Sequence, residues 1–433
     1  MFMYTKFVSH PHHYKNLFTP RCVLCLAMAV LILSISLVGQ VAHAEAPLEA
    51  VPWVNSPKSW TPSMSGDVVI PAGDASLPVA LTGVSARGAV LMEADSGQVI
   101  FGQNQNAKLP MASTTKIMTA LVALEALPVD TRVTIPSEAV GIEGSSIYLC
   151  EGEILTLEDL LYALLLESAN DAAVAIALTV DGSVEAFAER MNRKAADLGL
   201  TDTHFVNPHG LDHEEHYTTA YELGVITAAA LQNPVFSRIC ATDRKTIPLR
   251  GEEGIRLLLN HNKLLDSFEG CIGVKTGFTK KTGRCLVSAA QREGVTLVAV
   301  TLNAPDDWRD HTAMLEYGFG MYESVTLCDE GFFSAPLHLI SGTQEYVIAE
   351  NTASLSVVLK RNHGPISCTV ELPSFAFAPI AAGEMVGYLR FFEHAHDGTK
   401  RELGNIPLTA AYGVDEITYK LTLLDRILSM FGK

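Results

Sequence analysis

The order of strand-like and helix-like patterns constrains the fold of this chain more than any single motif does. A hairpin pattern comes first, with the strand-like runs 88–93 and 99–101 on either side of the turn Asp95-Ser96-Gly97. Helical periodicity then covers residues 116–127, 157–180, 184–198 and 221–231, and strand-like runs return at 272–275, 286–290 and 295–302. Because the strands gather at both ends instead of alternating with helices, the order predicts an α+β domain with an antiparallel sheet.

The first 44 residues have the pattern of an export signal. Three basic residues precede the uncharged run 22–39, and Ala42-His43-Ala44 places small residues at the alternate positions that signal peptidase reads. We therefore expect residues 1–44 to be a signal peptide, although an apolar run of about 18 residues is also long enough for an uncleaved anchor. Both alternatives predict an exported chain, at the outer face of the cytoplasmic membrane, in the cell wall or partly secreted.

Composition divides the rest of the chain. Residues 45–85 carry six prolines without sustained periodicity, which is typical of a leader or linker. Residues 86–322 hold the strand and helix patterns described above, and residues 325–412 have short apolar runs broken by Gly and Pro, which predicts a small all-β domain. Its strand-like runs include residues 346–348, 355–359 and 386–392. With 48% hydrophobic residues the chain can form ordinary cores in both domains.

Charge and residue spacing exclude several classes of function. The formal net charge of −17 becomes −20 when the signal segment, with three basic and no acidic residues, is removed, and such an acidic protein disfavours nucleic acid as a partner. Six cysteines lie outside the signal segment, so disulfides and free thiols both stay open, but none forms a CxxC pair. The histidines at 204, 209, 213 and 216 fit no usual zinc spacing, so no metal site is predicted.

The stretch Ala112-Ser113-Thr114-Thr115-Lys116 is the first candidate for catalysis. Ser113 and Lys116 lie at i and i+3 where a helical pattern begins, so their side chains share one face. A serine hydroxyl becomes a nucleophile when a base takes its proton, and a lysine with a depressed pKa can be that base. A helix N-terminus disfavours a nearby cation, and a second cation lowers the pKa of the first. Lys275, in Val274–Thr279, is the candidate for that second cation.

A further motif lies between these two. Glu167-Ser168-Ala169-Asn170-Asp171 follows an apolar helical pattern, and in it Ser168 can relay a proton to a leaving amine while Asn170 can bind a substrate amide. The motifs SxxK, SxN and KTG therefore occur in this order, at intervals of 55 and 107 residues. SxxK or KTG alone is a frequent chance match, whereas the three in order are typical of acyl-serine enzymes that react with penicillin.

With these motifs the chain resembles the D-alanyl-D-alanine carboxypeptidases of the low-molecular-mass penicillin-binding type. Further similarity lies in Asn207–Leu211, His216–Ala220, Asn260–Leu265 and Gly273–Val287. The resemblance covers about residues 86–322 and implies a β-lactamase/transpeptidase-like domain with an antiparallel sheet and a helical cluster, followed by the small β domain. It implies removal of the terminal D-alanine from peptidoglycan stem pentapeptides, inhibition by β-lactams, and no cofactor.

The resemblance also implies a role for each matching residue. Ser113 would be the acylated nucleophile and Lys116 the general base, with Ser168 as proton relay and Asn170 holding the acyl side of the peptide. The substrate carboxylate would bind at Lys275, Thr276 and Gly277 with help from Arg309, and the oxyanion hole would use the backbone N–H groups of Ser113 and Phe278. For Arg309 the alternative is an exposed helix arginine paired with Asp306 or Asp310.

Two departures from the family pattern and two other functions remain. Phe278 stands where relatives often have His or Tyr, and Ala169 where they have Asp or Gly. A serine β-lactamase shares the three motifs, but none of Glu214, Glu215, Glu252 and Glu253 lies in the Glu-x-x-Leu-Asn setting of a deacylating glutamate. A non-catalytic sensor that binds muropeptides or β-lactams would not require both Lys116 and Ser168.

The C-terminal residues 416–433 have an amphipathic helical pattern. Apolar residues recur on one side of a helical wheel, at 417, 421, 424, 427, 428 and 431. This pattern allows the tail to pack on the β domain of its own chain. We favour the alternative, in which the tail lies in the membrane interface and holds the enzyme at the membrane surface, because the pattern follows the end of the β-domain pattern at the C-terminus. With 17 residues and internal charges, residues 417–433 are too short and too polar to span a bilayer, so the helix would lie in the interface.

Overall fold

The computed structural model describes residues 68–70, 81, 83–250, 254–395 and 397–418. The predicted signal peptide, most of the predicted leader and nearly all of the amphipathic tail lie outside these residues. Within them, no helix is both long enough and apolar enough to cross a membrane.

In the region that precedes the C-terminal strands, an antiparallel sheet joins strands from residues 88–103 to strands from residues 271–302. Its strand order is β3-β2-β10-β9-β8, and β10 pairs with β2 in the register from Leu297↔Glu93 to Leu302↔Gly88. The strands are β2 (Gly88–Glu93), β3 (Val99–Gln103), β8 (Cys271–Thr279), β9 (Gly283–Arg292) and β10 (Val295–Leu302). The early hairpin is therefore completed by strands that come some 200 residues later, and β8 lies at the sheet edge.

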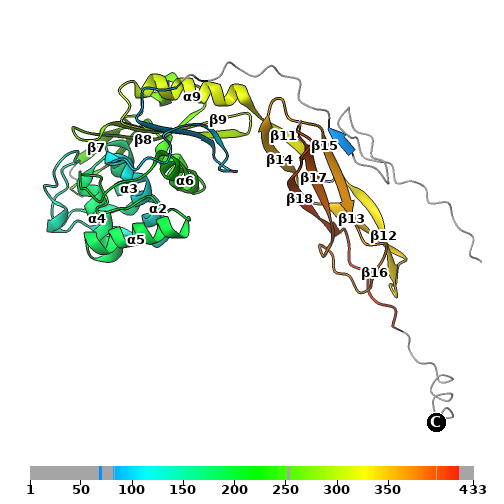
Figure 1. Ribbon diagram of the computed structural model, residues 1–433. Helices are drawn as coiled ribbons and strands as arrows, with labels where there is room; N and C mark the ends of the chain where they lie inside the picture. Colours follow the sequence, from blue (N-terminus) through cyan, green and yellow to red (C-terminus); the bar gives the residue numbers. More distant parts are fainter. Residues whose placement is uncertain (1–67, 71–80, 82, 251–253, 396, 419–433) are drawn as a thin grey trace, which may run out of the picture. The chain divides into compact units, whose positions relative to one another are not determined.

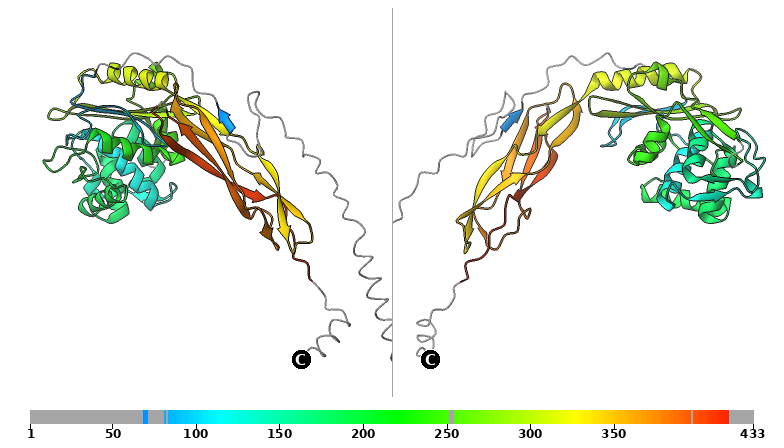
Figure 2. Two further views of the ribbon diagram at one scale, coloured as in Figure 1. Left: turned by 45° about the vertical axis from the view of Figure 1, so that its right-hand side comes forward. Right: turned by 180° about the vertical axis from the view of Figure 1, so that it is seen from behind.

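Residue alternation gives this sheet two buried faces. In β2, Val90 and Met92 contact the core of the helical cluster, while Ala89 and Leu91 contact the core under α9 (Asp307–Met321). Figures 1 and 2 show the cluster on one side of the sheet and α9 on the other. Successive side chains of a strand point to opposite faces of the sheet, so a run of consecutive apolar residues is the pattern of a strand that is covered on both faces.

The helical cluster largely follows the predicted segments. It contains α2 (Lys116–Ala126), α3 (Leu157–Leu166), α4 (Asn170–Asp181), α5 (Val184–Asp197), α6 (Ala220–Leu231), α7 (Pro234–Cys240) and the short α8 (Leu264–Ser267). The continuous helix predicted over 157–180 is wrong, because the chain turns at Glu167–Ala169. Ser168 has φ +60° there, a left-handed conformation that no α-helix continues through. Apolar periodicity runs on across this turn and hides it in the sequence.

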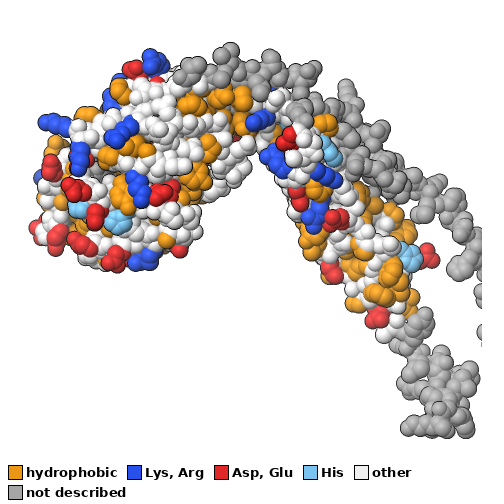
Figure 3. Space-filling model, viewed as in Figure 1, with side chains coloured by type: hydrophobic (Ala, Val, Ile, Leu, Met, Phe, Trp, Pro, Cys, Tyr) orange, Lys and Arg blue, Asp and Glu red, His pale blue; other side chains and the backbone are white. Residues whose placement is uncertain are grey.

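Two small antiparallel strand pairs border the cluster and were not predicted. Strands β4 (Arg132–Thr134) and β5 (Ile154–Thr156) pair with each other, as do β6 (Arg244–Leu249) and β7 (Gly254–Leu259). In Figure 3, Asp and Glu side chains are frequent on the visible face of the helical cluster, in keeping with the acidic composition.

The C-terminal region consists of strands. They are β11 (Tyr322–Cys328), β12 (Ser334–Ile340), β13 (Tyr346–Asn351), β14 (Leu355–Lys360), β15 (Ile366–Glu371), β16 (Ala376–Phe377), β17 (Met385–His394) and β18 (Lys400–Ala410). The main sheet has the order β1-β15-β17-β18-β13-β12-β16, in which β1 (Val68–Ile70), from the predicted leader, pairs antiparallel with β15. The predicted α+β fold, with an antiparallel sheet, a helical cluster and a sheet-rich C-terminal region, is therefore confirmed.

Candidate active site

The Ser113 and Lys116 side chains meet as their spacing predicts. Ser113 lies in the 3₁₀ turn η1 (Ala112–Thr115), and α2 begins at Lys116. Lys116 Nζ lies 2.9 Å from Ser113 Oγ, and the lysine side chain is fully buried in the helical cluster. A buried ammonium group must have hydrogen-bond partners, and Lys116 has two more: it donates to Asn170 Oδ1 over 2.7 Å and to the backbone oxygen of His209 over 2.6 Å.

This set of partners determines where a neutral Lys116 can accept a proton. The amide oxygen of Asn170 and the carbonyl of His209 can only accept, so they take both hydrogens of a neutral amine. The hydroxyl of Ser113 can also donate. The amine lone pair therefore points at the Ser113 hydroxyl, as a general base for that serine requires.

Burial and charge favour the neutral amine. Burial holds the pKa of Lys116 well below its usual value, and the nearby Lys275 lowers this pKa further, while Asp171 opposes the shift. Lys275 lies on β8, is buried as well, and donates to the backbone oxygen of Thr276 over 2.9 Å. Its pKa is lowered to about 7, mainly by burial, while Cys240 and Glu167 act in the opposite direction.

Asn170 is held at the first turn of α4 by a neighbouring loop. Its side-chain Nδ2 donates to the backbone oxygen of Glu143 over 2.6 Å, and its backbone N–H donates to the backbone oxygen of Ser145 over 2.7 Å. With Nδ2 committed to Glu143, Oδ1 is the atom that faces Lys116. Ser168 lies two residues before Asn170 in the turn that separates α3 from α4, and it is buried.

The KTG strand passes close to the backbone of the nucleophile. A Cβ on Gly277 would lie 3.1 Å from the backbone nitrogens of both Ser113 and Thr114, a contact that glycine avoids. The edge strand β8 is thereby brought next to the Ser113 N–H, the first of the two predicted oxyanion donors. The Phe278 side chain is 65% exposed, so it is available to solvent and ligand rather than to the core.

A loop that includes Pro208 and His209, which the SxxK, SxN and KTG motifs do not contain, contacts Lys116 and the residues next to it. The backbone oxygens of Pro208 and His209 accept from Thr119 Oγ1 and Lys116 Nζ, both over 2.6 Å. His216 Nδ1 accepts from a backbone N–H, so its Nε2 donates to Thr115 Oγ1, 2.8 Å away. Burial lowers the pKa of His216 to about 3, which keeps the ring neutral. Backbone carbonyls leave no trace in a residue pattern, so only the resemblance could have pointed to this loop.

Arg309 lies in α9 with its side chain 74% exposed. It pairs with Asp306 over 3.0 Å and lies 3.9 Å from Asp310, which is the alternative arrangement predicted for it. Its assignment to the substrate carboxylate therefore stays a prediction, and it requires Arg309 to leave these partners.

The described residues hold no group of three or more His, Cys, Asp or Glu side chains that could bind a metal ion. All four clustered histidines have other partners. His216 Nε2 donates to Thr115 Oγ1, and His204 Nδ1 lies 2.6 Å from the backbone oxygen of Glu215. His209 Nδ1 and His213 Nδ1 accept the backbone N–H groups of Leu211 and Glu215. Cys150, Cys240, Cys271, Cys285 and Cys328 are free thiols.

Comparisons with known proteins fit this geometry. Residues 75–306 match the family described as D-alanyl-D-alanine carboxypeptidase. The chain is 31% identical over 314 residues to the D-alanyl-D-alanine carboxypeptidase DacF of Bacillus subtilis, covering 70% of this chain and 80% of that protein. It is 35% identical over 261 residues to DacB2 of Mycobacterium tuberculosis, a protein with the same description, covering 58% and 87%.

A solved structure extends the similarity into the strand-rich C-terminal region. Penicillin binding protein 5 of Haemophilus influenzae superposes with a TM-score of 0.60 at 26% identity, covering 78% of this chain and all of that one. The family match extends over more than half of the chain and includes the SxxK, SxN and KTG motifs. This protein belongs to the D-alanyl-D-alanine carboxypeptidase family.

Proposed function

We propose that this protein is a serine-type D-Ala-D-Ala carboxypeptidase, which removes the terminal D-alanine from peptidoglycan stem pentapeptides through an acyl-enzyme on Ser113. One observation carries the proposal: Lys116 Nζ lies 2.9 Å from Ser113 Oγ while acceptors that cannot donate engage its other two hydrogens. This arrangement, in a family of D-alanyl-D-alanine carboxypeptidases, is suited to acyl transfer.

Acylation follows from the arrangement of these groups. Neutral Lys116 takes the Ser113 proton as Oγ attacks the carbonyl carbon of the penultimate D-alanine. The backbone N–H groups of Ser113 and Phe278 stabilise the oxyanion, and a donor of this kind contributes about 2.7–4 kcal/mol. Ser168 passes the proton from Lys116 to the nitrogen of the leaving D-alanine as the C–N bond breaks. Water then attacks the ester, with Lys116 again as base, and releases the shortened peptide.

The two ends of the substrate bind on opposite sides of Ser113. Lys275 and Thr276, with Gly277 allowing close approach, bind the terminal carboxylate, and Arg309 assists once it leaves Asp306. Asn170 binds the amide on the acyl side. A β-lactam carries an analogous carboxylate and a reactive amide, so it acylates Ser113 and inhibits the enzyme.

The location of the enzyme is part of the proposal. The substrate lies in the wall, so residues 1–44 act as an export signal, and the tail 416–433 holds the mature protein on the membrane surface. Flotation with liposomes tests the tail: the mature chain floats, and a chain shortened by residues 416–433 does not but still reacts with penicillin. If the full mature chain stays at the bottom, or if the truncation unfolds the β domain, the anchor role is wrong.

Two measurements test the chemistry. Intact-mass analysis after penicillin treatment should show one covalent equivalent on the wild type and none on Ser113→Ala, while Ser137→Ala, an exposed serine in the same domain, keeps the label. A D-alanine release assay with a tripeptide ending in D-Ala-D-Ala should show turnover. A preference for nitrocefin hydrolysis would identify a β-lactamase, and labelling without D-alanine release would identify a binding protein.

A further inference from the structure

Tyr148 projects from the loop next to the active site in an unusual way. Its side chain is 82% exposed, although it lies between the buried residues Ile147 and Leu149. Its backbone has φ +58°, a left-handed conformation that is costly for a residue with a Cβ. This conformation turns the ring outward while both aliphatic neighbours point into the core.

A buried carboxylate holds the backbone on both sides of Tyr148. Asp171 Oδ2 accepts from Leu149 N–H over 3.0 Å and from Ser146 Oγ over 2.6 Å, and Oδ1 accepts from Ile147 N–H over 3.3 Å. The Ser146 hydroxyl oxygen in turn accepts from the Tyr148 N–H over 2.9 Å. Asp171 directly follows Asn170, so the same turn of α4 holds the Tyr148 loop and the residue proposed for the acyl side of the substrate.

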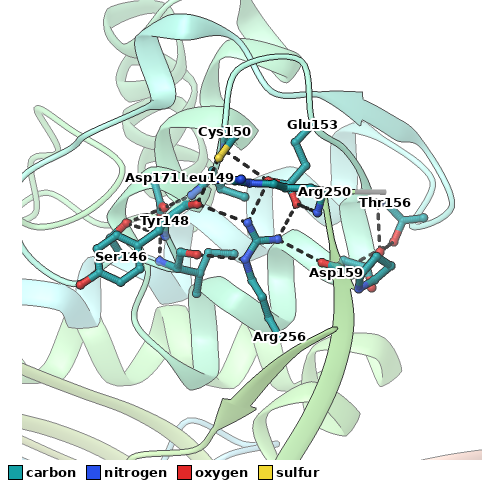
Figure 4. Close-up of polar contacts among 12 residues, drawn as sticks. Ser146, Tyr148, Leu149, Cys150, Glu153, Thr156, Asp159, Asp171, Arg250 and Arg256 are labelled. Carbon is teal, nitrogen blue, oxygen red and sulfur yellow. Dashed lines mark hydrogen bonds and ion pairs between the residues drawn. The ribbon is translucent and has the colours of Figure 1, made fainter. Parts of the chain in front are cut away.

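An ion pair from the β6–β7 hairpin fixes the other side of the loop (Figure 4). The Arg256 guanidinium pairs with Glu153, and only 9% of its side chain and 1% of that of Glu153 are exposed. The same guanidinium donates to the backbone oxygens of Ile147 over 3.0 Å and Tyr148 over 3.3 Å. Glu153 also accepts the N–H groups of Cys150 and Arg250. Removing one partner from such a pair leaves an unpaired buried charge.

The same short loop carries both the contacts to Asn170 and the exposed Tyr148 ring. Its beginning presents the backbone oxygens of Glu143 and Ser145 to Asn170. Three residues after Ser145 it presents the Tyr148 ring, and three residues span no more than about 11 Å. The Tyr148 ring is not part of a hydrophobic core, and two buried hydrogen-bond networks hold it outward on a strained backbone. This arrangement is expected of a ligand contact.

We propose that Tyr148 is a subsite residue for the part of the stem peptide that precedes the D-Ala-D-Ala pair, and that Arg256 and Glu153 are positioning residues for it. The ligand chemistry is the aliphatic side chain of the residue before that pair, which packs against the ring face. This inference rests on the proposed function, because it extends the acyl side of the substrate from Asn170 along the loop to Tyr148.

The test compares substrates of increasing length. N-acetyl-D-Ala-D-Ala lacks the preceding residue, diacetyl-L-Lys-D-Ala-D-Ala has it, and a muropeptide with a full pentapeptide continues beyond it. For Tyr148→Ala we expect the ratio of kcat/KM for the lysyl tripeptide to that for the dipeptide to fall about 3- to 10-fold, the usual range for an aromatic contact. The loss should lie mainly in KM. Tyr148→Phe should keep the wild-type ratio, because the ring face makes the contact.

Two further variants exclude a purely structural effect. Tyr148→Gly removes the ring but suits the positive φ, so it should be at least as stable as the wild type and show the same loss of ratio. Tyr346→Ala removes an exposed tyrosine from β13 in the C-terminal sheet and should leave the ratio unchanged. The proposal is wrong if Tyr148→Ala and Tyr148→Gly keep the ratio, or if these two variants lower kcat/KM equally for all three substrates. Failure of the wild type to release D-alanine from any substrate would instead reject the proposed function.

Arg256→Met tests the positioning role. It should lower the same ratio as Tyr148→Ala, and combining the two substitutions should cause no further loss of ratio, because Arg256 acts through Tyr148. Arg190→Met is the matched control, since Arg190 makes a comparable two-pronged pair with Asp181 at the far end of α4. An unchanged ratio in Arg256→Met, or a further loss in the double variant, would show that the ion pair does not position the ring.

Discussion

Gly210 packs against the turn that carries the nucleophile so closely that a Cβ on it would lie 1.9 Å from the backbone oxygen of Ala112. The same Cβ would lie 2.8 Å from Thr115 Oγ1. Gly210 follows His209, whose carbonyl accepts from Lys116, so this contact joins the loop behind the base to the turn that holds Ser113. The position of the catalytic pair therefore depends on a residue without a side chain.

Gly210→Ala should consequently slow penicillin acylation by at least roughly 10-fold. The new methyl group must move either the Ala112–Ser113 turn or the His209 carbonyl, and a small misplacement of reacting groups is costly. Acylation is followed with a fluorescent penicillin. Gly182→Ala is the control, because Gly182 also has a positive φ, at +76°, but a Cβ there would meet nothing within 4 Å. Equal acylation rates in the two variants would mean that the contact does not set the geometry of the site.

Lys116→Arg should lower the acylation rate by about 10²- to 10⁴-fold, the usual contribution of a general base. A guanidinium keeps its proton near neutral pH, so it can hold the charge of the site but cannot take the Ser113 proton. The rate is measured with penicillin in excess, alongside a thermal melt. Lys194→Arg, at a partly exposed ion pair with Glu125, is the control. An arginine variant that acylates within a few-fold of the wild type would assign the base to another residue.

The sequence allowed the catalytic pair to be predicted because its geometry is local. Ser113 and Lys116 are three residues apart at a helix start, so helical spacing places both side chains on one face, where Lys116 Nζ lies 2.9 Å from Ser113 Oγ. The strands of the five-stranded sheet were predictable for a similar reason, since a strand-like run is a property of each segment by itself. For Lys275 the sequence offered a candidate on charge grounds, which the resemblance then supported, because no local rule brings β8 next to η1.

Other parts of the site could not be predicted because they depend on backbone atoms and on distant partners. The carbonyls of Glu143, Ser145 and His209 hold the site together, yet any residue type supplies a carbonyl. Arg256 and Glu153 are 103 residues apart, and Arg256 lies on a hairpin that was not predicted. The outward turn at Tyr148 also gives no signal, since Ser-Ile-Tyr-Leu reads as a short strand.

Acid should destabilise the enzyme through its buried histidines. His311, buried between Thr301 Oγ1 and Ser288 Oγ, has its pKa lowered by burial to about 3, against 6.5 for an ordinary histidine. Between these values the unfolded chain binds more protons than the folded one, so stability is lost as the pH falls from about 6.5 towards 3. His311→Gln should reduce this loss, measured as melting temperature against pH. His338→Gln, at an exposed position on β12, should not. Parallel curves for all three proteins would contradict the prediction.

Lys275→Met should make the enzyme more stable at low pH and inactive. The pKa of Lys275 is about 7 in the fold and 10.5 ordinarily, so below pH 7 the folded state bears the full cost of the buried charge. That cost fades as the pH rises from 7 to 10.5. Methionine removes it, so we expect a melting temperature roughly 3 °C or more above the wild type at pH 6, and a difference that shrinks towards pH 10. Lys360→Met, at an exposed position, should show no such trend. A difference that stays constant with pH would mean that the buried charge of Lys275 is not the cause.

Asn170→Asp should move the pH dependence of acylation upward. Asn170 Oδ1 accepts from Lys116 over 2.7 Å, so aspartate places a carboxylate against the base with little change of shape. An opposite charge at this distance raises the pKa of a lysine by about 1–3 units. Acylation requires the neutral amine, so the rate at pH 7 should fall and recover at higher pH. Asn170→Ala removes the same acceptor without adding charge, so it should slow acylation without moving the acidic limb upward. If both variants slow the reaction and neither moves the limb, deprotonation of Lys116 is not the step that the pH profile reports.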